Sequence, residues 1–442
     1  MKQPAVKNYF FGDAYGDLWR TIAESWASND ESAKECFNKP GGTFATPFNW
    51  GMGISVYVFG TALFVACSAV HVTVLLSVAL VVYAAYSLLW LLDAGYRRWR
   101  RIFTACPHCY AKSILPVYHC PRCNAKHDRL YPSSYGIFMR RCECGEKIPT
   151  VFFNGRSKLP ATCPSCESSI MSEEARPVAI PIVGAPSVGK TFFVFSMVWS
   201  VREDFAVRRH LDFEFMNDYN KHLYEQQIER LNSGVILGKT PENNPVALNI
   251  FLSDEKKGSG GKDSKMGKNR SLLYLYDSAG EAFSSTQHLV AHKFYDYFSA
   301  LIFIIDPFSI PEVYSRYEDG LAAAGVSPSL TPVEDVYDAL IVNMEKNYNI
   351  KVTERISKPV AVVFSKTALF DLPERFAGPT RDDADEACRR FLRENGEESL
   401  LRKMEWKFAN ARYFAVNSGG QNSTGVDAVT GWLLGEINRD WR

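Results

Sequence analysis

The octet GAPSVGKT, which begins at Gly184, carries the residue types that hold phosphate and a divalent cation. Gly184 and Gly189 let backbone N–H groups turn toward a phosphate, and Lys190 can contact its outer oxygens. Thr191 offers a hydroxyl to Mg2+ at the start of a helix, whose N-terminus adds a positive dipole end. With Ser187 inside the loop, these residues predict a nucleotide phosphate site.

A second motif, DSAGE, follows an apolar run and begins at Asp277. Together with the octet it resembles the switch of the P-loop GTPases of the translation-factor and Ras-like (TRAFAC) class. The resemblance implies that Asp277 holds Mg2+ through water and that the Gly280 amide senses the γ-phosphate. Glu281 stands where Ras-like proteins carry a water-orienting Gln, so hydrolysis is expected to be slow. Thr240 lies where a switch threonine would bind Mg2+, or it ends an exposed loop.

The base-reading motif of that class, Asn/Thr-Lys-x-Asp, is altered in this chain to SKTA, which ends at Ala368. An alanine cannot accept the two hydrogen bonds that guanine donates, a loss of about 2 to 4 kcal/mol of discrimination. Lys366 keeps its place and can still cover a base. Asp371 could compensate only if its loop bends back, and Ser418 on a later loop could contact the base. Both GTP and ATP are therefore open as ligands.

Eight of the eleven cysteines form four close doublets. These are Cys106 and Cys109, Cys120 and Cys123, Cys142 and Cys144, and Cys163 and Cys166. Such spacing lets two sulfurs converge on one tetrahedral ion, so two doublets complete a closed, structural zinc site. We predict two zinc ribbons with the doublets paired in sequence order. The spacing also permits the second doublet to pair with the third.

The stretch from residue 54 to residue 92 contains no Asp, Glu, Lys or Arg. A single span needs about 20 apolar residues, so we predict a hairpin of two spans, at 48–69 and 72–92, with a break near residues 68–73. The alternative is one tilted span. The arginines from Arg97 onward place the following residues in the cytoplasm. A hairpin would return both termini there, in a multi-pass protein of the bacterial inner membrane.

After residue 176 the chain alternates apolar, strand-like runs with helix-like segments, which predicts a mostly parallel sheet covered on both faces. Strands are expected at 177–183, 246–252, 271–276, 300–306, 359–365 and 412–417, and helices at 217–231, 332–347, 380–395 and 424–438. The glycine-rich, charged segment 253–270 should be the tip of an antiparallel hairpin.

The predicted fold is thus an α/β P-loop NTPase domain preceded by two zinc ribbons and a transmembrane helical hairpin. The expected regions are an N-terminal cytoplasmic segment (1–47), the hairpin (48–93), the ribbons (94–172) and the nucleotide domain (173–442). This combination also resembles the double-GTPase type domains of bacterial conflict systems.

The resemblance implies a membrane-anchored, Mg2+-dependent nucleoside triphosphatase that acts as a switch on a protein partner, in antiviral defence. An ATP-using relative and a non-hydrolysing scaffold, whose ribbons recruit protein or nucleic acid, are the alternatives. The net charge of +1 gives no general attraction to nucleic acid. The expected partners are therefore the lipid bilayer, an effector protein and a second copy bound through the nucleotide domain.

Overall fold

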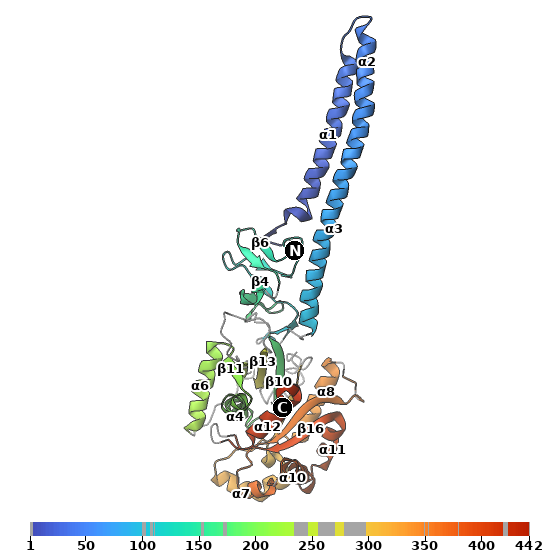
Figure 1. Ribbon diagram of the computed structural model, residues 1–442. Coiled ribbons are helices and arrows are strands. Elements are labelled where there is room, and N and C mark those ends of the chain that lie inside the picture. Colours follow the sequence, from blue (N-terminus) through green and yellow to red (C-terminus); the bar gives the residue numbers. More distant parts are fainter. Residues whose placement is uncertain are drawn as a thin grey trace. The chain divides into compact units, whose positions relative to one another are not determined.

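The computed structural model divides into two compact units, one made of residues 1–100 and 115–173 and the other of 101–114 and 174–442 (Figure 1). It describes residues 3–99, 103–106, 109, 111–151, 154–170, 175–233, 246–254, 270–277, 298–348, 350–351, 353–378, 380–418 and 423–441.

In the first unit, one long helix contains the whole uncharged stretch (Figure 1). It consists of α2 (Ala45–Ser55), a π turn (Val56–Gly60) and α3 (Thr61–Trp99). We call these 55 residues, Ala45–Trp99, the apolar helix. It is the single candidate span among the described residues.

The predicted break near residues 68–73, and with it the hairpin of two spans, is wrong. Thr73 Oγ1 donates to the Ala69 carbonyl at 2.7 Å, and Ser77 Oγ donates to the Thr73 carbonyl at 2.9 Å. The small polar side chains are thus satisfied by the helix's own backbone, one turn back. They do not interrupt the helix, and a multi-pass arrangement has no support.

An N-terminal arm, residues 3–38, precedes the apolar helix. It contains β1 (Ala5–Val6), a 3-10 turn (Tyr9–Phe11) and α1 (Asp13–Asn38). Helix α1 runs antiparallel along the apolar helix (Figure 1).

The cysteine-rich part of the chain consists of short antiparallel strands. One sheet has the order β5-β4-β8-β9 and another the order β1-β6-β7, while β2 pairs with β3. Their bounds are β2 Thr104–Ala105, β3 Lys112–Ser113, β4 Val117–His119, β5 Lys126–His127, β6 Met139–Cys142, β7 Lys147–Pro149, β8 Ala161–Thr162 and β9 Ser169–Ile170. Strand β1 of the N-terminal arm therefore completes the sheet that contains Cys142.

A buried group of three charges joins the end of the apolar helix to this cysteine-rich part. Asp93 Oδ2 lies 3.0 Å from Arg97 Nη2 and 3.3 Å from Arg156 Nη1. Arg156 also donates to the carbonyls of Leu130 and Thr150, at 3.1 and 2.9 Å. All three charged side chains are less than a tenth exposed. Asp93 is the first charged residue after the uncharged stretch. Its ion pair with Arg156 fixes the end of the apolar helix to the cysteine-rich part.

The second unit is built on a seven-stranded sheet with the order β11-β12-β13-β10-β14-β15-β16. The strands are β10 Arg176–Gly184, β11 Leu211–Phe215, β12 Val246–Asp254, β13 Arg270–Asp277, β14 Leu301–Ile305, β15 Ile356–Phe364 and β16 Phe408–Ala415. Strands β10, β13, β14, β15 and β16 are parallel, whereas β11 and β12 are antiparallel to their neighbours. A mostly parallel sheet, as predicted, is confirmed.

Helices separate the strands (Figure 1). They are α4 Lys190–Ser200, α5 Ala206–Arg208, α6 Asp218–Asn232, α7 Pro311–Ala323, α8 Val333–Tyr348, α9 Leu372–Arg375, α10 Arg381–Glu394, α11 Glu398–Lys407 and α12 Val426–Ile437. Thr380 and Asp383 form a capping box at the start of α10. Every residue of β14 is buried, which places the centre of the sheet in the core and leaves the strand ends for chemistry.

Candidate nucleotide site and metal centres

The phosphate-binding loop connects the end of β10 to the start of α4. A Cβ at Gly184 would come within 2.7 Å of the Ile304 carbonyl oxygen, so only glycine lets the loop leave the sheet this close to β14. Gly189, with φ +91°, precedes α4, and Ser187 has φ +63°. These left-handed residues fold the loop into a turn whose backbone can encircle an anion.

Lys190 is buried inside this loop rather than extended into solvent. Its Nζ donates to the carbonyls of Gly184 and Ala185, at 3.0 and 2.7 Å. A buried ammonium held by carbonyl oxygens at the N-terminus of a helix is positioned to pair with an entering phosphate.

The sheet register brings the predicted motifs to one edge. Ile182 of β10 is paired with Asp277 of β13, so the aspartate ends its strand beside the phosphate-binding loop. On the other side of β10, Gly184 is paired with Ile304 of β14. Farther along, Phe364 pairs with Ala415, so the loops after β15 and β16 leave the same edge. Ligands of open α/β sheets bind at this carboxyl edge.

Three predicted site residues, Thr240, Gly280 and Glu281, lie outside the described residues, and so does the side chain of Asp277. Their roles stay predictions.

Lys366, predicted to cover a base, is fixed by a buried carboxylate that sequence reasoning did not single out. Its Nζ lies 2.6 Å from Asp306 Oδ2 and donates to the Ser327 carbonyl at 2.9 Å. Asp306 is fully buried and also accepts from the backbone N–H groups of Phe308 and Ser329, at 3.0 and 3.1 Å. A carboxylate that ends a wholly apolar strand was the available sequence signal. Asp306 thus holds the ammonium group of Lys366 in place, which leaves the aliphatic part of the Lys366 side chain to cover a base.

Asp371 does not take the place of the missing carboxylate. Its side chain accepts from the hydroxyl of Tyr317 on α7 and lies 2.9 Å from Arg375 Nε on α9. The Tyr317 hydrogen bond, followed by that from Arg375, lowers the pKa of Asp371 below its usual value. Phe370, stacked on Tyr317 with centroids 4.9 Å apart, fixes the same segment. The loop therefore packs on α7 instead of bending back toward Ala368.

Ser418 lies on the loop that follows β16, next to the loop after β15 that carries Lys366 and Ala368. Thr367 Oγ1 donates to the Val416 carbonyl at 2.9 Å, which ties the two loops together. Asn417 and Thr424 exchange backbone hydrogen bonds of 3.0 and 2.9 Å and close the loop between them. Ser418 Oγ is buried and has no hydrogen-bond partner among the described residues. A buried, unpaired hydroxyl at this place is a suitable group for contacting a ligand.

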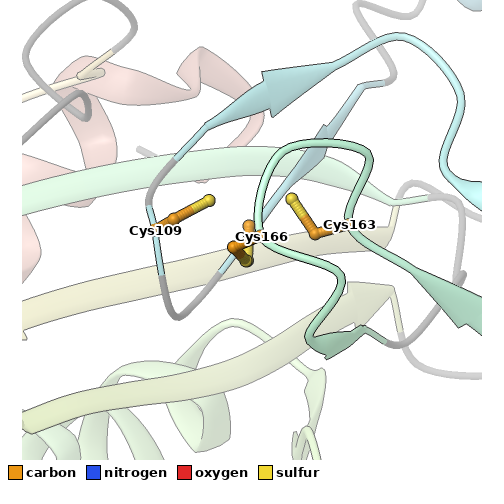
Figure 2. Close-up of side chains that lie close together, drawn as sticks. Cys109, Cys163 and Cys166 are labelled. Carbon is orange, nitrogen blue, oxygen red and sulfur yellow. The ribbon is translucent and has the colours of Figure 1, made fainter.

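The eight doublet cysteines gather into two groups of four. In each group the sulfur atoms lie within 4.8 Å of one another. One group contains Cys120, Cys123, Cys142 and Cys144, and the other contains Cys106, Cys109, Cys163 and Cys166. Figure 2 shows the side chains of Cys109, Cys163 and Cys166 close together. The predicted pairing in sequence order is therefore wrong, and the arrangement is nested, with the inner pair of doublets forming one site.

Strand pairing connects the two groups to each other. Strand β4, which leads into the second doublet, pairs antiparallel with β8, which leads into the fourth, so these two doublets follow opposite ends of the strand pair and belong to different groups. At several doublets the backbone forms the same tight turn. For example, Cys120 N–H donates to the Ala125 carbonyl at 3.0 Å, and Asn124 adopts φ +57°. His119, adjacent to a ligand, is engaged by Thr162 and Asn124.

The chemistry of both groups fits Zn2+. Four sulfurs, with no further donor in either group among the residues that the structure describes, would make a closed tetrahedral site, which is structural rather than catalytic. A hydrogen bond from the Glu146 backbone lowers the pKa of Cys144 to about 7, whereas burial raises the pKa of Cys142 to about 12. Zinc binds thiolates, so loading would release protons, chiefly from the buried thiols.

The fold and the loop geometry together define a P-loop nucleotide-binding domain of the GTPase type. The model of the family described as Double-GTPase 2 matches residues 178–433, more than half of the chain. The chain therefore belongs to this family.

Among solved structures, the Arl6 BBS3 small GTPase from Trypanosoma brucei with bound nucleotide analogue GppNp is similar to this chain. The match has 13% identity and a TM-score of 0.27, and it covers 60% of this chain and 99% of that chain. At these values it adds nothing to the family assignment. No curated protein matches the chain.

Proposed function

We propose that the protein is a membrane-anchored, Mg2+-dependent GTP-binding switch that hydrolyses its nucleotide slowly. The observation that carries the proposal is the common edge of the sheet, where the phosphate-binding loop, Asp277 and the loops of Lys366 and Ser418 all end. In this proposal the loop and Lys190 bind the phosphates. Thr191 and Asp277 hold Mg2+, which supplies charge neutralisation for phosphoryl transfer.

Calorimetric titration of GTP tests the nucleotide site. Lys190→Ala should weaken binding by about 10- to 100-fold, the range expected for removing a charged hydrogen-bond donor. Lys221→Ala is the matched control, because Lys221 lies on α6 with a side chain 55% exposed and only a loose contact to Glu225. Equal affinities in the two variants would refute the phosphate site.

Hydrolysis is the second part of the proposal. The motif DSAGE predicts Glu281 beside the γ-phosphate, where its charge would repel the nucleotide unless a partner or second copy supplies an arginine. Slow phosphate release that depends on Mg2+ and is abolished by Asp277→Ala supports the enzyme. If the unaltered protein releases phosphate no faster than Asp277→Ala under every condition, the protein binds nucleotide without hydrolysing it.

An ATP-using relative is favoured by one specific observation. Ala368 offers no acceptor to guanine, and Asp371 is held by Tyr317 and Arg375 instead of replacing it. Competition of GTP and ATP for a fluorescent analogue separates these functions. A preference for ATP would overturn GTP as the ligand without touching the phosphate chemistry.

Membrane anchoring rests on the apolar helix. Its uncharged stretch is longer than one span requires, and none of its most apolar window is buried within the structure. Arg97 and Arg98 follow the stretch, and the tendency of such basic residues to stay cytoplasmic supports a cytoplasmic nucleotide domain. Resistance to alkaline carbonate extraction in bacterial membranes supports the anchor, and complete release into the supernatant would refute it.

In this proposal the two zinc ions stiffen the cysteine-rich module, and the nucleotide state controls an effector protein. The resemblance of the domain combination to double-GTPase type domains of bacterial conflict systems is the basis for proposing a role in bacterial defence. Infection assays with the Lys190→Ala variant test that role. Undiminished protection would show that nucleotide binding is not required.

A further inference from the structure

We propose that the N-terminal arm is a detachable cover of the apolar helix. In the closed state α1 packs along the apolar helix. When that helix crosses a bilayer, the arm separates from it and is carried to the opposite side. The proposal rests on the proposed membrane anchoring.

The closed state is held by specific packing along the whole of α1. Near its C-terminal end, the ring of Phe37 meets Trp50 edge-on, with centroids 5.7 Å apart. In the middle, Trp26 Nε1 donates to Ser68 Oγ at 3.3 Å. At the beginning of the arm, Phe11 meets Tyr83 at 5.3 Å. The contacts therefore extend along most of the uncharged stretch.

Two glycines of the apolar helix let α1 approach closely. A Cβ at Gly53 would lie 2.9 Å from ring atoms of Phe37. A Cβ at Gly60 would lie 2.2 Å from Asn29 Oδ1. By contrast, a Cβ at Gly51 meets nothing within 4 Å. A side chain at position 53 or 60 would force Phe37 or Asn29 out of its packed position and so weaken the contact with α1, while one at position 51 would not.

The charge of α1 conflicts with a place in the bilayer. It carries six acidic and two basic residues, a net charge of −4, along its whole length. Its ion pairs are exposed to solvent: the side chains of Arg20 and Asp17 are 72% and 43% exposed, and those of Lys34 and Asp30 are 67% and 49% exposed. Lipid would face these groups if the two helices entered together, and charges in the hydrocarbon core are strongly disfavoured.

Separation also requires β1 to leave β6, because the arm reaches the apolar helix only through residues 39–44. The contacts that hold the start of the arm are few. They are the two-residue pairing of β1 with β6, the hydrogen bond that Gln3 Oε1 accepts from Arg140 Nη1 at 3.1 Å, and two backbone hydrogen bonds, from Asn8 to Ser134 at 3.0 Å and from Glu143 to Pro4 at 3.2 Å. The free energy gained by burying the uncharged stretch in lipid can therefore exceed the free energy lost when β1 separates from β6.

A disulfide between positions 29 and 60 tests the proposal. A Cβ at position 60 would lie 3.0 Å from Asn29 Cγ, itself one bond from Cβ, so the two Cβ atoms are within disulfide range. We would make the full chain with Asn29→Cys and Gly60→Cys, and with Cys36→Ser and Cys67→Ser, by cell-free translation in the presence of zinc. Vesicles of phosphatidylethanolamine and phosphatidylglycerol are added or left out.

The expected result is efficient cross-linking in the chain made without vesicles and at least a fivefold lower yield in the carbonate-resistant vesicle fraction. A disulfide formed before vesicles are added should block entry into that fraction, and reduction should restore it. In the uncrosslinked chain, Gly53→Leu should raise the carbonate-resistant fraction, and the matched control Gly51→Leu, with equal added apolar surface, should not.

Equal insertion of the cross-linked and reduced chains would overturn the cover, because the helices would then enter as a pair. Equal insertion of the Gly53→Leu and Gly51→Leu variants would also contradict it. Absence of a carbonate-resistant fraction in every variant is a different result: it refutes the membrane anchor itself, and the cover with it.

Discussion

The ion pair between Asp306 and Lys366 gives the sharpest test of how the loop that carries Lys366 is held in place. Asp306→Asn keeps the size of the side chain, but an NH2 group replaces an oxygen that accepts from Lys366 or from a backbone N–H of Phe308 or Ser329. Removing one partner of a buried pair costs about 3 to 5 kcal/mol. Lys366 is 18% exposed and can regain some hydration. We therefore expect the free energy of unfolding of the nucleotide domain to fall by about 2 to 4 kcal/mol.

Hydrogen exchange of the buried β15 amides in the full chain measures this loss as the free energy of opening the nucleotide domain. Asp338→Asn is the matched control, since the Asp338–Lys403 pair spans 2.9 Å with side chains 52% and 40% exposed. Such surface pairs contribute about 1 kcal/mol or less. A double-mutant cycle of Asp306→Asn with Lys366→Met should show a coupling of at least about 1 kcal/mol. Equal losses in both Asn variants, or no coupling, would refute the tether.

Three other features of the two sites give testable predictions. Cys120→Ser and Cys142→Ser should each remove one of two zinc ions, as measured by mass spectrometry. Because both cysteines belong to the same group, the double variant should also lose only one ion. Loss of both ions in the double variant would instead support pairing in sequence order. Ala368→Asp should raise the GTP to ATP affinity ratio about tenfold or more, given charged hydrogen bonds of about 1.5 to 3 kcal/mol, and an unchanged ratio would show that this loop does not read the base. Tyr317→Phe should raise the pKa of Asp371 toward its ordinary value, as followed by carboxyl NMR titration. Because the folded-state pKa is lowered, the stabilisation is present at neutral pH and is lost as pH falls from the ordinary aspartate value through the folded-state pKa.

The sequence was sufficient for the positions of the central strands and for the mostly parallel character of the sheet, because continuous apolar runs between helices are typical of strands buried on both faces. The run that became β14 is an example. Strand β11 was missed although its five residues, LDFEF, alternate apolar and acidic side chains, the pattern of a half-exposed strand. It lies on the sheet edge, and it is shorter than the continuous apolar runs of the central strands.

Other features depend on distant contacts that spacing does not reveal. The cysteine pairing brings Cys106 and Cys109 to Cys163 and Cys166, which lie far along the chain, and doublet spacing does not reveal such a contact. The missing break in the apolar helix follows from Thr73 bonding one turn back. Asp306 was visible as a strand end, but its role became clear only when Lys366, sixty residues later, was seen beside it.

The buried trio of Asp93, Arg97 and Arg156 has a mechanical consequence. A helix attached by a single flexible joint can twist or tilt in a membrane without disturbing the domain attached to it. Here Asp93 of the helix binds the Arg156 guanidinium, which also donates to the Leu130 and Thr150 carbonyls, while Arg97 of the same helix shares the carboxylate. This buried attachment resists rotation of the helix about its own axis relative to the residues around Arg156. In the proposed membrane anchor, a change in bilayer thickness or tension that tilts or turns the helix would therefore also act on the cysteine-rich part.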